Sequence, residues 1–255
     1  MGAAETVDLP AVRRFEAAGF RAWPAASVSY DGTWVIRVTP DHPSRRLNSV
    51  NVLDRRDVAD LGQRITSAAA RFRAQGVRPA FRLSPLSGPA LEDRLATLGW
   101  KPLAETIVMR LPLAGAQVAA AEPVRSVGSD AFLAAAQSVA GWDDLRVAAT
   151  AGLVSRIQAD LGLFVGDEGG CPVASLICVR DGDLAGIFEL ATAPAARGRG
   201  HARRLLTSAL SWAQRRGARQ GWLQVEADNS AGSRLYGSLG WTAVYRYHYR
   251  QAAEG

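Results

Sequence analysis

The chain has 255 residues, of which 48% are apolar and 21% charged, and its formal net charge at pH 7 is +6. This much apolar sequence can form a real core, which argues against a disordered protein, and no apolar run is as long as a membrane span. Apart from Lys101, every cationic side chain other than histidine is an arginine, a composition that favours anionic partners. The arginines are spread along the chain rather than gathered in a tail or stripe, which disfavours nucleic acid as the partner.

The cysteines and histidines give no sign of a metal site or a disulfide framework. Cys171 and Cys178 are separated by six residues, with no CxxC pair and no histidine close by. This spacing favours buried free thiols in a reducing cytoplasm over a zinc site or a disulfide. The three histidines are scattered along the chain. We therefore expect a cytoplasmic protein with no bound metal and no membrane association.

The small-residue run AGAQVAAAEP, residues 114–123, divides the chain into two halves. We predict one domain over residues 1–118 and a second over residues 119–255. In the first half, a hairpin-like pair precedes a helix, a strand, a second helix and an alternating strand. These patterns cover 30–40 and 45–53 for the hairpin, a helix that ends at Gly76, a helix over 91–100, and a strand closed by Leu111-Pro112-Leu113.

The second half has the pattern of two helices, three strands, helix, strand, helix and strand. Ser or Asp in a capping position begins each of the first two helices, and Gly169-Gly170 and Asp181-Gly182-Asp183 give hairpin turns. The expected elements lie at 129–141, 143–161, 161–168, 172–182, 184–192, 201–217, 222–227, 230–240 and 242–249.

The two halves repeat one plan at an offset of 141 residues. Gly217 follows Gly76 by this distance, as Gly240 follows Gly99, and LEDRLATLGW then aligns with GSRLYGSLGW. A shared Leu-Gly-Trp without a gap favours duplication of one unit over a chance match of helical patterns. We therefore predict an α/β fold made of two related domains.

The segment ATAPAARGRGHARRLL, residues 191–206, joins a predicted strand to a predicted helix. Its glycines allow the backbone to approach a ligand closely, and the start of a helix presents unpaired N–H groups to an anion. Arg197 and Arg199 add positive charge. The alternative is a basic helix that merely starts after a glycine-rich turn.

This segment resembles the signature of the GNAT superfamily of acyl-CoA-dependent N-acyltransferases. The family pattern Q/R-x-x-G-x-G/A is matched by Arg197 to Ala202, which follow a strand that ends in Leu190-Ala191-Thr192-Ala193-Pro194. A second family segment, N-x-x-A-x-x-L-Y-x-x-L-G-F, resembles NSAGSRLYGSLGW, in which Asn229 precedes Tyr236 by seven residues. The resemblance covers residues 122–250. It implies, for each half, a mixed, mostly antiparallel twisted sheet flanked by helices.

By this resemblance the cosubstrate is acetyl-CoA. Its diphosphate would be bound by backbone N–H groups of the loop, its pantetheine arm by Asn229, and the acyl carbonyl by backbone N–H groups of a splayed strand. Asn229 can equally serve as a plain helix N-cap. The loop residues are Arg197, Gly198, Arg199, Gly200, His201 and Ala202, and the strand residues are Leu190, Ala191 and Thr192.

The first half lacks these features at the same offset. Asp57 stands where the second half has Gly198, Asp60 stands where it has His201, and Leu95 replaces Tyr236. Two carboxylates suit a helix start but repel a diphosphate. We expect a degenerate GNAT-like first half without a coenzyme site, an arrangement known among tandem members of the superfamily.

Attack of an amine on a thioester needs an acid for the departing thiolate and a base for the amine. The resemblance makes Tyr236 the candidate acid, the alternative being a tyrosine that only packs under the last helix. Related ribosomal-protein acetyltransferases carry a glutamate where this chain has Gln224, which cannot take a proton. Glu189 is therefore our first candidate base and Glu226 the second, with a water relay as the alternative.

These observations favour an N-acetyltransferase that acts on a primary amine of a small molecule or peptide by direct attack in a ternary complex. The alternatives are acetylation of a protein N-terminus or lysine, and a non-catalytic acyl-CoA sensor.

Three further features bear on the acceptor and on assembly. Asp143 and Asp144, beside Trp142, can attract a cationic amine or simply cap a helix. The polar cluster of Arg45, Arg46 and Asn48 favours an interdomain contact over a contact with substrate. The aromatic strand TAVYRYHY either forms a homodimer or packs against the first half.

Overall fold

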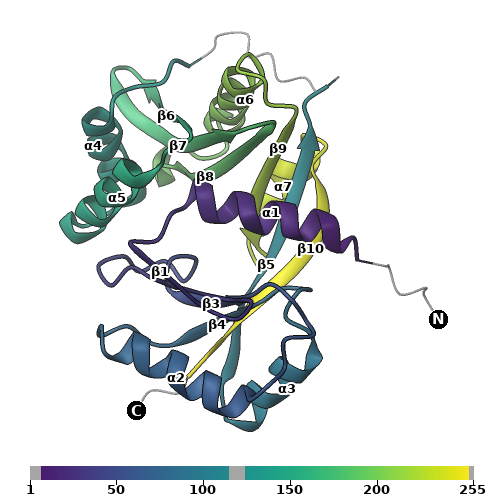
Figure 1. Cartoon of the computed structure of the whole chain (residues 1–255). Helices are drawn as coiled ribbons and strands as arrows, with labels where there is room; N and C mark the ends of the chain where they lie inside the picture. The colour runs from purple at the N-terminus through teal and green to yellow at the C-terminus, as the bar shows by residue number, and fades with distance from the viewer. Residues whose placement is uncertain (1–6, 115–123, 253–255) are drawn as a thin grey trace.

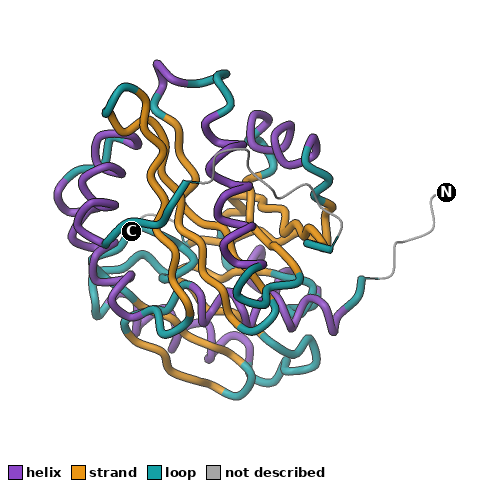
Figure 2. The backbone as a smooth tube through the Cα atoms, turned by 90° about the horizontal axis from the view of Figure 1, so that it is seen from above, coloured by secondary structure: helices purple, strands orange, loops and turns teal. Residues whose placement is uncertain are grey.

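The computed structural model describes residues 7–114 and 124–252, which form one mixed sheet of ten strands with helices on both faces (Figures 1 and 2). The strand order is β1-β2-β3-β4-β10-β5-β9-β8-β7-β6. Among the paired strands, β3–β4 and β8–β9 are parallel and the other pairs are antiparallel. The predicted α/β class with a mostly antiparallel sheet is confirmed, but the two halves share a single sheet.

The first half supplies three helices and five strands of this sheet. They are α1 (Leu9–Ala22), β1 (Ser27–Asp31), β2 (Trp34–Val38), β3 (Ser49–Val52), α2 (Leu61–Arg73), β4 (Ala80–Leu83), α3 (Pro89–Thr97) and β5 (Lys101–Pro112). The second half supplies α4 (Ser129–Ala140), α5 (Asp144–Arg156), β6 (Asp160–Glu168), β7 (Cys171–Asp181), β8 (Leu184–Thr192), a short 3₁₀ helix (Pro194–Ala196), α6 (His201–Gln214), β9 (Gln220–Glu226), α7 (Ser230–Ser238) and β10 (Thr242–Gln251).

The last strand of each half pairs with strands of the other half. β10 lies between β4 and β5, while β5 lies between β10 and β9. The boundary we predicted between residues 118 and 119 lies outside the described residues, and the division into two domains stays a prediction. The exchange of β5 and β10 means that neither half completes its sheet alone.

Side chains that alternate along β7 separate two apolar cores. Ile177 and Val179 point to one core with α1, α4 and α5, whereas Leu176 and Cys178 point to another under α6. A third core lies between α2, α3 and the strands β2–β4. The first of these cores contains residues from both halves, so the halves fold together.

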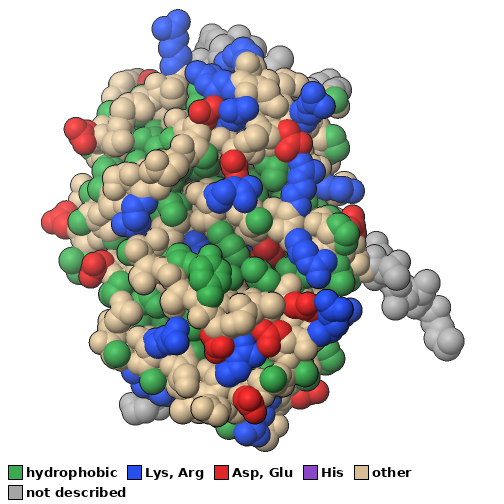
Figure 3. Space-filling model, viewed as in Figure 1, with side chains coloured by type: hydrophobic (Ala, Val, Ile, Leu, Met, Phe, Trp, Pro, Cys, Tyr) green, Lys and Arg blue, Asp and Glu red, His purple; other side chains and the backbone are tan. Residues whose placement is uncertain are grey.

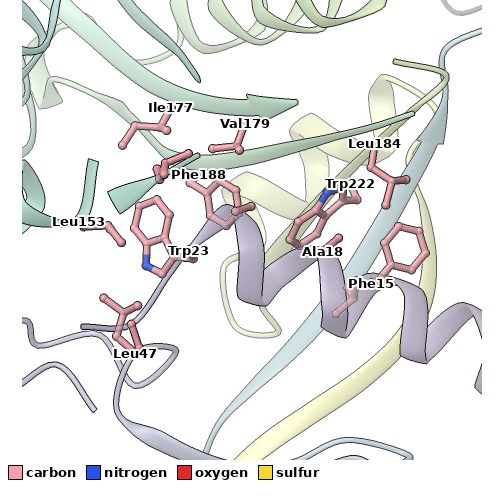
Figure 4. Close-up of a cluster of buried hydrophobic side chains, with 14 of the residues drawn as sticks. Phe15, Ala18, Trp23, Leu47, Leu153, Ile177, Val179, Leu184, Phe188 and Trp222 are labelled. Carbon is pink, nitrogen blue, oxygen red and sulfur yellow. The ribbon is translucent and has the colours of Figure 1, made fainter. Parts of the chain in front are cut away.

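Stacked aromatic rings join the halves inside this shared core (Figure 4). The ring of Trp23, just after α1, stacks on Phe188 of β8 at a centroid distance of 4.6 Å. Phe188 in turn meets Trp222 of β9 edge to face, and Trp222 contacts Phe15 of α1. Such pairs bury large apolar areas, so α1 is held firmly against the second half.

Helix α1 was not predicted, and three further details of the structure differ from expectation. Asp143 caps α5, but the residue that caps α4 is Gly128, so Ser129 is already helical. The second helix ends at Arg156 rather than near residue 161. Cys171 is exposed, so only Cys178 is the buried free thiol that we expected.

The aromatic strand β10 packs against the first half, which was the second of the two roles that we predicted for it. It pairs with β5 along its length on one side, and on the other side its last four residues, His248–Gln251, pair with β4. Tyr245, Tyr247 and Tyr249 alternate into the shared core and are buried there. The strand therefore packs against the first half, and a homodimer through it stays a prediction.

The surface and the helices agree with the composition. Figure 3 shows arginine side chains scattered among acidic and apolar ones on the visible face rather than gathered in one stripe. No helix within the described ranges is long and apolar enough to cross a membrane.

Candidate active site

The two parallel strands β8 and β9 separate part way along their length. They pair only from Leu184 to Ile187 and from Gln220 to Leu223, although β8 continues to Thr192 and β9 to Glu226. Beyond the paired stretch, β8 leaves one edge without a strand partner. This opening at the carboxyl ends of parallel strands is a common place for a ligand.

A local irregularity in β8 accompanies the separation. The pairing register between β7 and β8 shifts between Ser175 and Ile177, and Glu189 there has a φ of 48°. Left-handed backbone costs an ordinary residue about 1–2 kcal/mol, and strained residues of this kind cluster at functional sites. The irregularity turns β8 and redirects Leu190, Ala191 and Thr192 toward the opening.

The glycine loop has the backbone that an anion site needs. Gly198 and Gly200 have φ values of 75° and 85°, and a Cβ added to either would meet no protein atom within 4 Å. Gly200 is the N-cap of α6 and makes no side-chain cap. Both glycines are therefore required by the backbone, and the space around them is open to a ligand.

Backbone donors line this loop without a partner. Within the described chain, the N–H groups from Gly198 to Arg203 donate to no acceptor, and the first helical bond of α6 runs from Arg204 to the carbonyl of Gly200. Unpaired N–H groups at a helix start carry the positive end of the helix dipole. They can bind phosphate oxygens directly.

A cleft of about 910 Å³ runs from this loop along β8 to α7. Its walls include nearly every residue that we predicted for the coenzyme, the exception being Arg199. The predicted residues in the lining are Leu190, Ala191, Thr192, Arg197, Gly198, Gly200, His201, Ala202, Asn229 and Tyr236; Ser138 to Gly141 at the end of α4 form part of the remaining wall.

Tyr236 lies in the wall of the cleft with its ring edge to face with Trp241, at 5.9 Å. Burial raises the pKa of its phenol to about 12, so the hydroxyl stays protonated at neutral pH. The hydroxyl makes no hydrogen bond with a described residue, so it is not tied to the backbone. Leu95, its counterpart in the first half, is fully buried in an apolar core.

Asn229 caps a helix and also lies in the wall of the cleft, so its location is compatible with both of its predicted roles. Its side chain accepts a hydrogen bond of 2.8 Å from the N–H of Gly232 and so caps α7. The same residue lines the cleft. A Cβ on Gly232 would crowd Asn229 at 3.1 Å, which explains the glycine at that position.

Glu168, at the end of β6, is an acidic neighbour of the loop that the sequence did not reveal. It forms an ion pair with Arg199, and one of its oxygens lies 3.5 Å from Nε2 of His201. Arg199 is therefore turned toward Glu168, which accounts for its absence from the cleft wall.

A second, smaller cavity of about 280 Å³ lies between the halves, at the ends of β5, β9 and β10. Gln224 and Glu226 both line it, as their alternation along β9 predicts. Its other lining residues are Pro43, Ser44, Arg45, Arg46, Ala104, Thr106, Arg146, Tyr247 and Tyr249.

The two candidate bases differ in their surroundings. Glu189 contacts two arginines, with Oε2 at 3.0 Å from Arg146 and Oε1 at 3.6 Å from Arg46, and only 15% of its side chain is exposed. Glu226 is exposed in the cavity wall and has no ion pair with a described residue. Gln224 accepts a hydrogen bond of 2.6 Å from the hydroxyl of Tyr247.

The remaining predicted residues have local structural contacts. Asp143 accepts a hydrogen bond from the N–H of Arg146, and Asp144 accepts one from the side chain of Gln137. Asn48 bonds backbone groups of Thr39 and His42. Arg46, through Glu189, makes the interdomain contact that we expected.

Sequence reasoning missed Arg146 and the tyrosines that line the smaller cavity. Arg146 comes two residues after Asp144, in the first turn of α5, so its place on this helix was readable from the capping residues. Tyr247 and Tyr249 lie on one face of β10, which their alternation in the sequence already indicates.

The loop comparison between the halves needs one correction. The N-caps Asp60 and Gly200 both have left-handed backbone and lie 140 residues apart, because α6 has 14 residues and α2 has 13. At the loops, Val58 rather than Asp57 therefore corresponds to Gly198, and Asp60 corresponds to Gly200 rather than to His201.

The described residues thus form a mixed α/β fold with a cleft where two parallel strands separate, beside a glycine loop at a helix start. Residues 132–241 match the model of the acetyltransferase (GNAT) family. The match covers 110 of the 255 residues and contains both motifs, so the resemblance that the sequence predicted is confirmed for this part of the chain.

Two curated proteins are similar to the chain in sequence. The chain is 24% identical over 252 residues to an uncharacterized N-acetyltransferase, YobR, of Bacillus subtilis, and the match covers 94% of this chain and 98% of that protein. Over 72 residues, 28% of this chain, it is 36% identical to half of the ribosomal protein bS18-alanine N-acetyltransferase of Haemophilus ducreyi.

Two solved structures share the fold over nearly the whole chain. A GCN5-related N-acetyltransferase from Kribbella flavida has a TM-score of 0.70 at 16% identity and covers 98% of both chains. A tandem GNAT protein from the clavulanic acid biosynthesis pathway has a TM-score of 0.63 at 13% identity, covering 93% of this chain and 86% of that one.

Proposed function

We propose that the protein is an N-acetyltransferase that moves an acetyl group from acetyl-CoA to a primary amine of a small molecule or peptide. The observation that carries this proposal is the 910 Å³ cleft, whose wall includes both Tyr236 and the glycine loop with its unpaired N–H groups at the start of α6. The donors suit the diphosphate of coenzyme A, and the separated strand β8 suits its pantetheine arm. Acetylation of a protein N-terminus or lysine is the alternative that the bS18-alanine relative suggests.

In the reaction that we propose, the amine nitrogen attacks the thioester carbonyl carbon and the C–S bond breaks. The unpaired edge of β8 from Leu190 to Thr192 offers backbone N–H groups to the carbonyl oxygen as negative charge develops there. Tyr236 gives its phenolic proton to the departing sulfur. Holding both reactants at the opening between β8 and β9 supplies a further large part of the acceleration.

We assign the base to Glu226 ahead of Glu189, which reverses our sequence-based order. Glu226 faces the cavity on the acceptor side without an ion-pair partner in the described chain, whereas Glu189 is occupied by Arg46 and Arg146. Glu226, directly or through a water molecule, takes the proton that the amine loses. Glu189 then acts as a positioning residue that holds the two arginines.

Removal of the Tyr236 hydroxyl tests the acid. In Tyr236→Phe we expect kcat for thiol release in the presence of an amine to fall about 100-fold, because the sulfur loses its proton donor. The dissociation constant for acetyl-CoA should stay within about twofold, since the ring remains. The matched control is Tyr30→Phe, which alters an exposed tyrosine on β1. Full activity of Tyr236→Phe would remove Tyr236 from this role.

The pH dependence of kcat/KM tests the base. In Glu226→Gln we expect kcat/KM at neutral pH to fall about 100-fold and its acidic limb to disappear. Glu189→Gln should raise KM for the amine and leave the acidic limb where it is in the wild type. If the two variants exchange these results, Glu189 is the base.

A further inference from the structure

The smaller cavity between the halves carries more positive than negative charge. Three arginines line it, and Glu226 is the one carboxylate in its wall among the described residues. Glu189, behind the wall, contacts two of the arginines. With three guanidinium groups and two carboxylates, the site has a net positive charge. The arginines are Arg45 from the loop after β2, Arg46 beside it, and Arg146 from α5.

Two of the arginines are held in place by their surroundings. Arg46 lies over the rings of Trp23 and Phe188, at 5.4 and 5.7 Å from their centroids, and Arg146 lies over Trp142 at 5.3 Å. Each guanidinium has five N–H donors, so Arg46 and Arg146 together have ten. The carboxylate of Glu189 can accept hydrogen bonds from only some of them. Both groups therefore keep donors for a ligand in the cavity.

Arg45 is not needed to hold the halves together. Its side chain is exposed and forms no ion pair or hydrogen bond with a described residue, unlike Arg46. An arginine without a partner, placed beside two others at a cavity, has its whole fork available to an anion.

The lowered pKa of a buried histidine beside the cavity is a further sign of the positive charge there. His42, which precedes this loop, is buried, and burial together with Arg146 and Arg46 lowers the pKa of its imidazole to about 3. The imidazole therefore stays neutral over the physiological range and neither adds to nor offsets the charge of the three arginines.

We propose that this cavity selects an acceptor amine that also carries a carboxylate, which Arg45, Arg46 and Arg146 bind while the amine points to Glu226 and the opening between β8 and β9. This inference rests on the proposed function and narrows its substrate class. A volume of about 280 Å³ suits a molecule of the size of an amino acid or a dipeptide, and is too small for a folded protein surface. Arginine forks bind carboxylates in pairs of parallel hydrogen bonds, which gives the site its geometry as well as its charge.

The test compares amines that differ only in this group. Amino acids and dipeptides of increasing length are offered with acetyl-CoA alongside their C-terminal amides, and thiol release is followed. We expect at least one free carboxylate to have a kcat/KM about 10- to 100-fold above that of its amide, the range given by hydrogen bonds to a charged group. Arg45→Ala should reduce this ratio by about tenfold, through a higher KM for the carboxylate.

Arg73→Ala is the matched control, because Arg73 is an exposed arginine in the last turn of α2 outside both cavities, and its loss changes the net charge equally. This control should keep the wild-type ratio. A panel in which amides react as well as carboxylates, or in which Arg45→Ala and Arg73→Ala behave alike, would overturn the inference and leave the transferase proposal standing.

A binding measurement separates this inference from the proposed function. The N-acetylated products, as carboxylates and as amides, are titrated calorimetrically into the protein saturated with coenzyme A. Preferential binding of the carboxylates without turnover of any amine would support the anion site and contradict the transferase proposal. Equal or absent binding of both forms would contradict the anion site.

Discussion

The loops before α2 and α6 occupy the same place in the two halves of the chain but differ in charge. One leaves backbone N–H donors open to a cleft, and the other contains a carboxylate with internal partners. Before α6, Gly198 and Gly200 leave backbone donors open to a cleft. Before α2, Asp57 brings a carboxylate into the corresponding loop and accepts hydrogen bonds from the N–H and hydroxyl of Thr33, at 2.9 and 2.7 Å. The carboxylate of the first loop thus binds a structural partner, whereas we propose that the donors of the second loop bind a ligand.

Arg64 binds the carboxylate of the first loop from within the fold. Its guanidinium contacts Asp57 at 2.6 Å and Asp31 at 3.1 Å, lies 4.1 Å from the centroid of the Trp34 ring, and is 13% exposed. A cation in this loop is therefore paired within the fold. The comparison teaches that two similar helix starts can differ in one respect: one holds an internal carboxylate where the other leaves its backbone donors without a partner among the described residues.

The largest expected effect comes from placing a carboxylate in the second loop. In Gly198→Asp we expect affinity for acetyl-CoA to fall by more than about 100-fold, because a negative charge and a side chain enter the space for the diphosphate. Gly76→Asp is the control: it introduces the same residue at a φ of 68° with equally open surroundings, far from the cleft. Calorimetry should show normal binding in this control. Equal loss of binding in both variants would indicate general damage rather than a lost site.

Removing the charge from the first loop should affect stability rather than binding. The hydrogen bond from Arg64, with help from Thr33, holds the pKa of Asp57 well below its usual range. We expect Asp57→Asn to lower the free energy of unfolding by about 2 kcal/mol at pH 7 without changing the affinity for acetyl-CoA. Asp54→Asn, which breaks a surface pair with Arg56, is the control and should have little effect.

The sign of the pH dependence follows from the lowered pKa of Asp57. Its charge stabilises the folded state fully above the unfolded pKa of about 3.9, and this stability is lost as pH falls through the lower folded value. Denaturant unfolding should therefore show the gap between wild type and Asp57→Asn closing below about pH 4. A gap that stays constant with pH would show that the charge is not the cause.

The smallest expected effect concerns Glu168, the acidic neighbour of the second loop. Glu168→Gln should release Arg199 and weaken the repulsion of the diphosphate, so that acetyl-CoA binds about twofold to fivefold more tightly. The gain should shrink at high salt. Glu105→Gln, which breaks an exposed pair with Arg246, is the control. Weaker binding of acetyl-CoA in Glu168→Gln would mean that Glu168 positions the loop, rather than competing with the diphosphate for Arg199.

Local patterns in the sequence predicted the elements of the second half and the glycine loop, because turns, caps and periodicity depend on neighbouring residues. They also predicted that Gln224 and Glu226 share a face of β9 and that Asn229 caps α7. The exchange of β5 and β10 was not predictable, because alternation fixes the faces of a strand but not its partner.

The surroundings of Glu189 were likewise hidden from the sequence. Arg146 lies 43 residues away and Arg46 is in the other half, so their meeting depends on packing. The left-handed backbone of Glu189 also interrupts the alternation of side chains along β8, which no local pattern in the sequence indicates. The one-residue difference between α2 and α6 shifted the loop alignment in the same way, because an ungapped offset cannot represent it.

The most direct test of the account is a calorimetric titration of the protein with acetyl-CoA that records stoichiometry along with affinity. The account predicts one site per chain, lost in Gly198→Asp and retained in Asp57→Asn, because only the second loop offers its donors. Two sites per chain would contradict the loss of the first site, and no binding would contradict the assignment of the cleft itself.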